Sequence, residues 1–235
     1  EILRCLVGSE MCIRDRQYVD PFIGTGFHGH TFPGATRPYA MVQLSPDTHI
    51  MGWDASSGYH YDDQQIYGFS HTHLSGTGIG DLGDILLLPF SGGDSIKPVA
   101  TFKKETEKAT PGYYAVRLDN LGVNVELTST DRVGFHRYTF DNPKDRRVML
   151  DLGHVLQPNW GHKLVSNDYQ LVNDSTVEGT YKTQGWAHFH SVSYRVTFSE
   201  PMTKIYQYID GKMLSLIPHL RAHETSQDLV CRLLL

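Results

Sequence analysis

Two His-x-His pairs are the residues whose types and spacing most directly suggest chemistry: His28-Gly29-His30 and His71-Thr72-His73. Alternate residues of an extended segment face the same way, so each pair could direct two imidazoles at one metal ion. Asp81 and Asp84 could supply the further ligands that a transition metal requires. The same imidazoles could instead exchange hydrogen bonds among buried polar loops. The spacing alone does not decide between the two, and we assign no metal ligand.

Aromatic and acidic residues stand together in a turn-rich segment, where Trp53-Asp54 is followed by Ser56-Ser57-Gly58-Tyr59-His60-Tyr61. Sugar sites combine such groups, because an aromatic ring packs on the apolar C–H face of a pyranose while polar side chains bind its hydroxyls. Several of these aromatics are expected in the core instead.

The segment Gly78–Gly83 matches the dinucleotide-binding pattern GxGxxG. That pattern binds a pyrophosphate only when a helix follows, because the helix N-terminus holds the phosphates. Here a short apolar run, Asp84–Pro89, follows and ends at proline, as a buried strand would. We therefore expect a tight glycine-rich turn or a loop beside a site, and no nucleotide.

Paired carboxylates, which glycoside hydrolysis requires, could be sought among six aspartates of this region. They are Asp47, Asp54, Asp62, Asp63, Asp81 and Asp84. The sequence gives no distance between any two of them, so we assign no catalytic residue. Residues 17–212 contain neither a cysteine nor a Gly-x-Ser-x-Gly nucleophile elbow.

Short strands joined by turns must position these groups. Turn signals recur every few residues up to about residue 100, with short apolar runs between them at Ala40–Leu44, Ile66–Phe69 and Asp84–Phe90. Beyond them, large residues alternate along segments such as Gly134–Phe140 and Phe189–Phe198. The pattern predicts one all-β domain, an antiparallel β-sandwich.

The composition limits the partners. The chain has 235 residues, a formal net charge of −5 and a pI near 6.2. This balance argues against a basic phosphate-binding surface, so nucleic acid is not an expected partner. No run of about 18 apolar residues occurs, so we expect no transmembrane segment, and the chain begins without a signal-peptide pattern.

The two ends of the chain are related as antisense translations. Reverse-complementing codons for residues 1–11 gives residues 229–219, in eleven consecutive pairs from Met11 with His219 to Glu1 with Leu229. Protein folding imposes no such symmetry, whereas an inverted DNA repeat around a sequenced insert does. We therefore predict that 1–16 and 213–235 are sequencing-adapter artefacts and that 17–212 is the domain. The alternative is that 214–235 is a genuine C-terminal helix.

Several long motifs together resemble the N-terminal domain of glycoside hydrolase family 92. They are Val19-Asp20-Pro21-Phe22-Ile23-Gly24-Thr25-Gly26, His28-Gly29-His30-Thr31-Phe32-Pro33-Gly34, Gly52-Trp53-Asp54 and Gly68-Phe69-Ser70-His71-Thr72-His73, continuing to Asp84. The resemblance is strong over about 18–90 and rests on strand pattern alone over about 100–210. Phe27, Arg37 and Tyr39-Ala40 depart from the family's pattern, which has glycine at the first of these positions.

The resemblance implies a calcium-dependent, inverting exo-α-mannosidase that acts on α-mannosides of N-glycans or mannan. In that family the β-sandwich packs on an (α/α)6 catalytic domain, which supplies the general acid, the base and the calcium ligands and is absent from this chain. We therefore expect an inactive piece that forms a wall of the mannose site. Trp53 is the expected contact with mannose, with Asp54, His71, His73 and Asp81 behind it.

Two further expectations follow from the resemblance. Glycan substrates imply a periplasmic, cell-surface or secreted protein. A separated domain should expose an apolar face where the (α/α)6 domain docks, whereas the alternative, a free-standing carbohydrate-binding β-sandwich module, would cover that face with charge.

Overall fold

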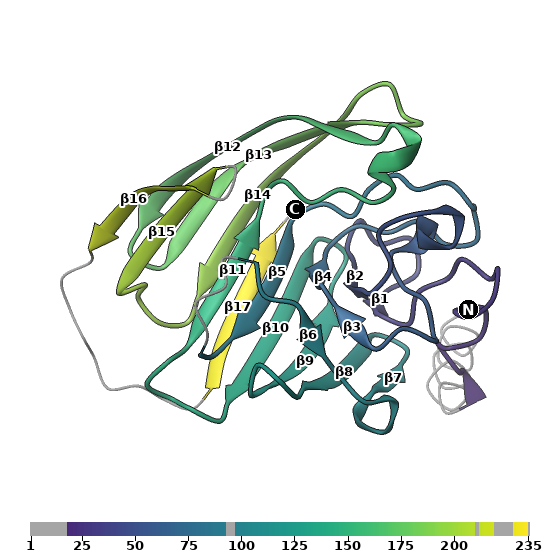
Figure 1. The fold of residues 1–235 in the computed structure, drawn as a ribbon, viewed down its shortest axis with the longest axis horizontal. Helices are drawn as coiled ribbons and strands as arrows, with labels where there is room; N and C mark the ends of the chain where they lie inside the picture. The colour runs from purple at the N-terminus through teal and green to yellow at the C-terminus, as the bar shows by residue number, and fades with distance from the viewer. Residues whose placement is uncertain (1–17, 93–96, 210–211, 219–227, 235) are drawn as a thin grey trace, which may run out of the picture.

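The computed structural model describes residues 18–92, 97–209, 212–218 and 228–234. In this part of the chain the regular structure is almost entirely β, and helical structure is limited to short 3-10 turns, among them η2 (Trp53–Ser57), η3 (Lys104–Thr106) and η4 (Pro158–Trp160). Figure 1 shows the strands stacked in layers, with the turn-rich N-terminal segment at one end.

Two large antiparallel sheets contain most of the strands. In sheet order, the larger consists of β12 (Lys163–Asn173), β13 (Thr176–Gln184), β14 (His190–Phe198), β17 (Asp228–Leu234), β10 (Val133–Phe140), β9 (Val123–Ser129), β8 (Tyr113–Leu118) and β7 (Lys108–Thr110). The smaller consists of β1 (Ala35–Thr36), β2 (Gln43–Asp47), β4 (Gly68–Ser70), β5 (Leu86–Phe90) and β11 (Arg147–Asp151). Two short pairs join β3 (Gln65–Ile66) to β6 (Ala100–Thr101) and β15 (Lys204–Ile209) to β16 (Lys212–Pro218).

The alternation along the larger sheet follows from its two different faces. In β9, Val123, Val125 and Leu127 are buried, whereas Asn124 and Thr128 are exposed. Successive side chains of a strand point to opposite faces, so such a strand has one apolar face and one polar face.

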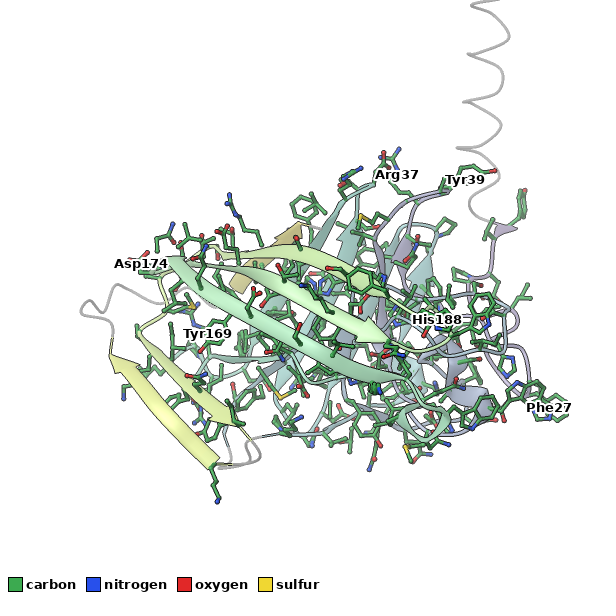
Figure 2. All side chains as sticks on the ribbon, turned by 90° about the horizontal axis from the view of Figure 1, so that it is seen from above. Phe27, Arg37, Tyr39, Tyr169, Asp174 and His188 are labelled. Atoms are coloured by element: carbon green, nitrogen blue, oxygen red, sulfur yellow. The ribbon has the colours of Figure 1, made fainter. Side chains whose placement is uncertain are left out.

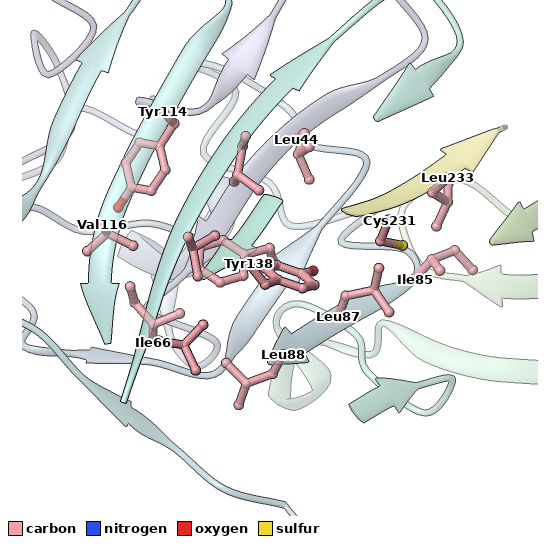
Figure 3. Close-up of a cluster of buried hydrophobic side chains, with 14 of the residues drawn as sticks. Leu44, Ile66, Ile85, Leu87, Leu88, Tyr114, Val116, Tyr138, Cys231 and Leu233 are labelled. Carbon is pink, nitrogen blue, oxygen red and sulfur yellow. The ribbon is translucent and has the colours of Figure 1, made fainter. Parts of the chain in front are cut away.

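One apolar core lies between the two sheets (Figure 3). Leu44 and Leu87 from the smaller sheet belong to the same buried cluster as Tyr114, Tyr138 and Leu233 from the larger sheet. The predicted fold class, an all-β antiparallel β-sandwich, is confirmed.

The structure describes part of the C-terminal segment 213–235, which the antisense symmetry predicts to be an artefact. Residues 212–218 and 228–234 form β16 and β17, so the alternative of a C-terminal helix is wrong for these residues. Their coding origin stays a prediction, because a strand of any origin can pair if its side-chain pattern fits. The predicted adapter segment 1–16 lies outside the described residues.

Candidate functional site

Five loops gather at one end of the sandwich, here called the loop end. They are residues 27–30, 52–54, 76–81, 157–162 and 185–189, and the contacts described below connect them. All of these loops except 76–81 expose one or two large aromatic side chains. They are Phe27, Trp53, Trp160, Trp186 and Phe189. In Figure 2, Phe27 and His188 lie toward the side of the molecule away from Asp174. These exposed rings make the loop end the candidate functional site.

Trp53 lies at the centre of these contacts. It begins η2 directly after Gly52, whose φ of 84° is readily adopted only by glycine. The indole packs against His28 and His30, with ring centroids 5.0 Å and 4.5 Å away, and remains 45% exposed. An aromatic face held in this way is available to a ligand at low entropic cost.

Asp54 joins the first His-x-His pair at the surface. Its Oδ1 lies 2.8 Å from His28 Nδ1 and 3.1 Å from His30 Nε2. The hydrogen bond from His28 holds the pKa of Asp54 below its usual value. The carboxylate stays about one-third exposed, so it can also accept a hydrogen bond from a ligand hydroxyl.

Gln157 fixes the main chain beneath Trp53. Its Nε2 donates to the carbonyl oxygens of Gly52 (2.7 Å) and Trp53 (3.1 Å), and its Oε1 accepts from the N–H of Gly80. The Gln157 residue is 1% exposed and has a φ of 53°, a left-handed conformation that costs a non-glycine residue about 1 kcal/mol or more. One buried amide therefore connects three loops of the site.

Asp81 fixes the main chain of the turn between β13 and β14, as Gln157 does beneath Trp53. Its carboxylate, in a residue only 6% exposed, accepts the N–H groups of Trp186 (3.1 Å) and Ala187 (2.7 Å). A Cβ on Gly185 would collide with this carboxylate. The turn is thus anchored from below, while the Trp186 side chain is 74% exposed.

His73, in the second His-x-His pair, binds a buried carboxylate. Its Nε2 lies 2.7 Å from Asp47 Oδ1, and its Nδ1 donates to the Gln43 carbonyl oxygen at 2.7 Å. His154 Nε2 lies 2.7 Å from the other oxygen, Asp47 Oδ2. Although burial opposes ionisation of Asp47, the charge of His73 and the hydrogen bonds from both imidazoles lower its pKa to about 2.

His71 faces away from His73 and starts a buried hydrogen-bond chain. Its Nδ1 donates to the Ile85 carbonyl oxygen at 2.6 Å, so in a neutral ring its Nε2 accepts from His136 Nε2 at 2.8 Å. His136 Nδ1 then accepts from the Tyr138 hydroxyl at 2.8 Å. Burial lowers the pKa of His71 to about 4 and that of His136 well below its usual value, so both rings are neutral near pH 7.

Asp84 does not join the histidines in a metal site. Its Oδ2 accepts from Thr72 Oγ1 (2.6 Å) and lies 2.8 Å from His190 Nε2, while its buried Oδ1 has no hydrogen-bond partner. Nowhere in the described ranges do three or more His, Cys, Asp or Glu side chains gather so that they could hold a metal ion. These residues therefore do not fit the calcium ion that the family resemblance implies.

The structure divides the predicted site residues into two groups. Trp53 and Asp54 lie together at the surface, whereas His71, His73 and Asp81 are buried and contact other protein groups. Sequence reasoning missed Gln157, His154 and Trp186, whose partners are about 100 residues away along the chain. Turn signals stand beside all three, at Gly153, Pro158-Asn159 and Gly185, but such signals do not indicate a distant partner.

The sequence and the fold were compared with those of known protein families and solved structures. Residues 18–228 match the family model for the glycosyl hydrolase family 92 N-terminal domain. The chain belongs to this family. A solved α-mannosidase of family GH92 from Bacteroides thetaiotaomicron, in complex with mannoimidazole, matches with a TM-score of 0.83 and 31% identity over 93% of this chain and 32% of that chain.

Two further relatives extend the comparison. A family GH92 inverting mannosidase from Bacteroides thetaiotaomicron VPI-5482 shares the fold, with a TM-score of 0.71 and 23% identity over 92% of this chain and 30% of that chain. A protein described as an uncharacterized secreted glycosidase, from Arthroderma benhamiae, is 34% identical over 152 residues, which are 58% of this chain and 19% of the relative. The chain thus spans about a third of these solved relatives and about a fifth of the fungal one.

Proposed function

We propose that this chain forms one wall of the mannose-binding site of an α-mannosidase, with Trp53 as the main contact. The observation that carries the proposal is that Trp53 is 45% exposed although its ring is braced by two histidines and its main chain by Gln157. A large ring held rigidly in solvent suits the apolar face of a pyranose. The mannosidase relative solved with mannoimidazole supports the choice of sugar.

Of the other predicted residues, Asp54 lies at the surface of this wall and the remaining three lie beneath it. Asp54, beside the indole, accepts a hydrogen bond from a sugar hydroxyl. His71, His73 and Asp81 do not touch the sugar in this arrangement, because they are buried and bound to other groups. They position the loops that carry the surface residues.

The parent enzyme requires parts that the described residues do not supply. We assign hydrolysis with inversion to two carboxylates of an (α/α)6 catalytic domain of the same polypeptide, since inversion needs carboxylates about 6.5–9.5 Å apart around a water. Calcium is assigned to that domain too, on the strength of the family resemblance. The exposed rings of the loop end form the apolar face against which that domain docks.

The compartment follows from the substrate. We propose a secreted, cell-surface or periplasmic parent enzyme that acts on N-glycan or mannan α-mannosides, in keeping with the secreted fungal relative. In the residues that the structure describes, no helix has the length and apolarity that spanning a bilayer demands.

Ligand-observed NMR with methyl α-mannoside tests the sugar contact directly. We expect weak binding by the full chain, loss of the signal in Trp53→Ala and an unchanged signal in the control Tyr206→Ala, whose ring is 48% exposed on β15. The control removes an equally exposed ring outside the loop end. Equal binding by the unaltered chain and Trp53→Ala would contradict the proposal.

The same preparation separates the proposal from its alternative, a free-standing carbohydrate-binding module. Hydrolysis of an aryl α-mannoside by the full chain would show that its own residues are catalytic, against the expectation of an inactive piece. Binding of mannan with high affinity and without hydrolysis would favour the module. Weak binding, strengthened when the (α/α)6 domain is supplied in the parent polypeptide, would favour the wall.

A further inference from the structure

All three tryptophans of the chain lie at the loop end. They are Trp53, Trp160 and Trp186, and they are 45%, 57% and 74% exposed. None belongs to the buried cluster between the sheets, whose aromatic members are tyrosines and phenylalanines. Tryptophan is highly buried on average in folded proteins. The exposure of every tryptophan at one end of the sandwich therefore indicates a role outside the core.

The main chains of Trp53 and Trp160 are held by one residue, Gln157. Its side-chain Nε2 donates to the Trp53 carbonyl oxygen at 3.1 Å, and its main-chain carbonyl oxygen accepts from the Trp160 N–H at 3.0 Å. Gln157 itself is buried. The two exposed rings are thus carried by main chain that a single buried residue fixes in place.

Trp186 is connected to the same buried residue through Gly80 and Asp81. The Gly80 N–H donates to Gln157 Oε1, and the carboxylate of Asp81, the next residue, accepts the Trp186 N–H at 3.1 Å. The loop 76–81 therefore links the third tryptophan to the first two, although it exposes no large aromatic side chain of its own.

Each of the three rings has a polar side chain within two residues of it along the chain that is at least partly exposed. These are Asp54, Asn159 and His188. Carboxylate, amide and imidazole groups exchange hydrogen bonds with sugar hydroxyls. Aromatic faces with such groups beside them are the combination that sugar sites use.

We propose that Trp53, Trp160 and Trp186 form one surface, here called the tryptophan platform, which binds an α-mannoside of at least three sugar units with one unit on each indole. The inference rests on the proposed function, in which Trp53 contacts mannose, and extends it from one mannose to a longer glycan. It assigns the tryptophans to the glycan and leaves Phe27 and Phe189 for docking of the catalytic domain.

The dependence of affinity on glycan length tests the tryptophan platform. Ligand-observed NMR titrations of the full chain compare methyl α-mannoside with a linear α-mannotrioside. We expect the trioside to bind about tenfold more tightly or better, because each further ring contributes about 2- to 10-fold in affinity. Trp160→Ala and Trp186→Ala should each reduce this preference by that factor, and the control Tyr206→Ala should leave it unchanged.

Two results of this titration would overturn the platform. One is a preference of about threefold or less, which three equivalent units give by statistics alone. The other is an unchanged preference in either Trp160→Ala or Trp186→Ala, because one unit is assigned to each ring.

The position of Trp186 is tested by moving the ring without removing it. A Cβ on Gly185 would lie 2.1 Å from Asp81 Oδ1, so Gly185→Ala must displace the turn. We expect the same loss of length preference as in Trp186→Ala. The matched control Gly153→Ala, whose Cβ makes an ordinary contact of 3.4 Å with Asp151 Oδ1, should keep the preference. A full preference in Gly185→Ala would contradict a fixed platform.

Failure of the platform and failure of the proposed function give different results. Loss of methyl α-mannoside binding in Trp53→Ala, together with no length preference in the unaltered chain, supports the single mannose contact and overturns the platform. Binding of neither sugar by the unaltered chain overturns the proposed function, and the platform with it.

Discussion

The two His-x-His pairs have the same spacing and opposite roles. At the loop end, the exposed His28 and the buried His30 converge on one oxygen of Asp54 and brace the exposed Trp53. In the interior, His71 and His73 diverge, toward His136 and Asp47 respectively. The first pair supports a ring that a ligand can reach, and the interior pair connects the segment after β4 to β10 through His136 and to β2 through Asp47. Both rings of the interior pair are buried, whereas in the first pair His30 is buried and His28 is exposed, and the spacing does not encode this difference.

Removing the buried carboxylate should break the interior arrangement. Asp47→Ala leaves His73 and His154 buried without their acceptor, which costs about 3–5 kcal/mol of unfolding free energy. Urea unfolding followed by circular dichroism measures the change. A loss below about 1 kcal/mol would show that the buried cluster contributes no more than a surface ion pair.

Acid should destabilise the protein through the interior pair. Because burial lowers the pKa of His71 from 6.5 to about 4, the unfolded chain binds a proton at a higher pH than the folded one. The contribution of His71 to the free energy of unfolding is full above pH 6.5. It decreases as the pH drops toward 4, by about 2–3 kcal/mol at pH 4.5. Urea midpoints at pH 7 and 4.5 measure it, and a flat profile over this range would contradict the neutral His71–His136 chain.

The matched change at the surface should have the smallest effect on stability. Asp54→Ala removes the acceptor shared by His28 and His30. Because the side chains of Asp54 and His28 are exposed to solvent, the expected loss in the free energy of unfolding is about 0.5–1 kcal/mol. Its larger consequence is weaker binding of methyl α-mannoside, observed by the same NMR experiment. A loss of stability equal to that of Asp47→Ala would remove the distinction between the two pairs.

The sheets could be predicted from the sequence more fully than the site. Alternation identified the segments that became β10 and β14, because a half-buried strand imposes period two on its residues. The predicted strand at 84–90 corresponds to β5 with a shifted start, whereas 40–44 overlaps only the first two residues of β2 and 66–69 falls across the end of β3 and most of β4. Short strands between turns carry too few residues to fix their limits.

The site resisted prediction because its connections are long-range. Gln157 binds Gly52 and Trp53, and Asp81 binds the turn at Trp186, each across about 100 residues of chain. Local patterns mark a turn or an aromatic residue but not its distant partner. The family motifs contain Trp53 and Asp54, which lie together at the surface, while the depth of His71, His73 and Asp81 emerged only from the fold.

The central place of β17 also has a consequence for synthesis on the ribosome. Its partner β10 leaves the ribosome about 90 residues earlier than β17, which at about 5–20 residues per second means a delay of roughly 5–20 s. Throughout that delay the nascent sheet has an open edge that can pair with another chain. The period of greatest aggregation risk is therefore set by translation speed rather than by the stability of the finished domain, and slowing translation between codons 140 and 228 should lower the soluble yield.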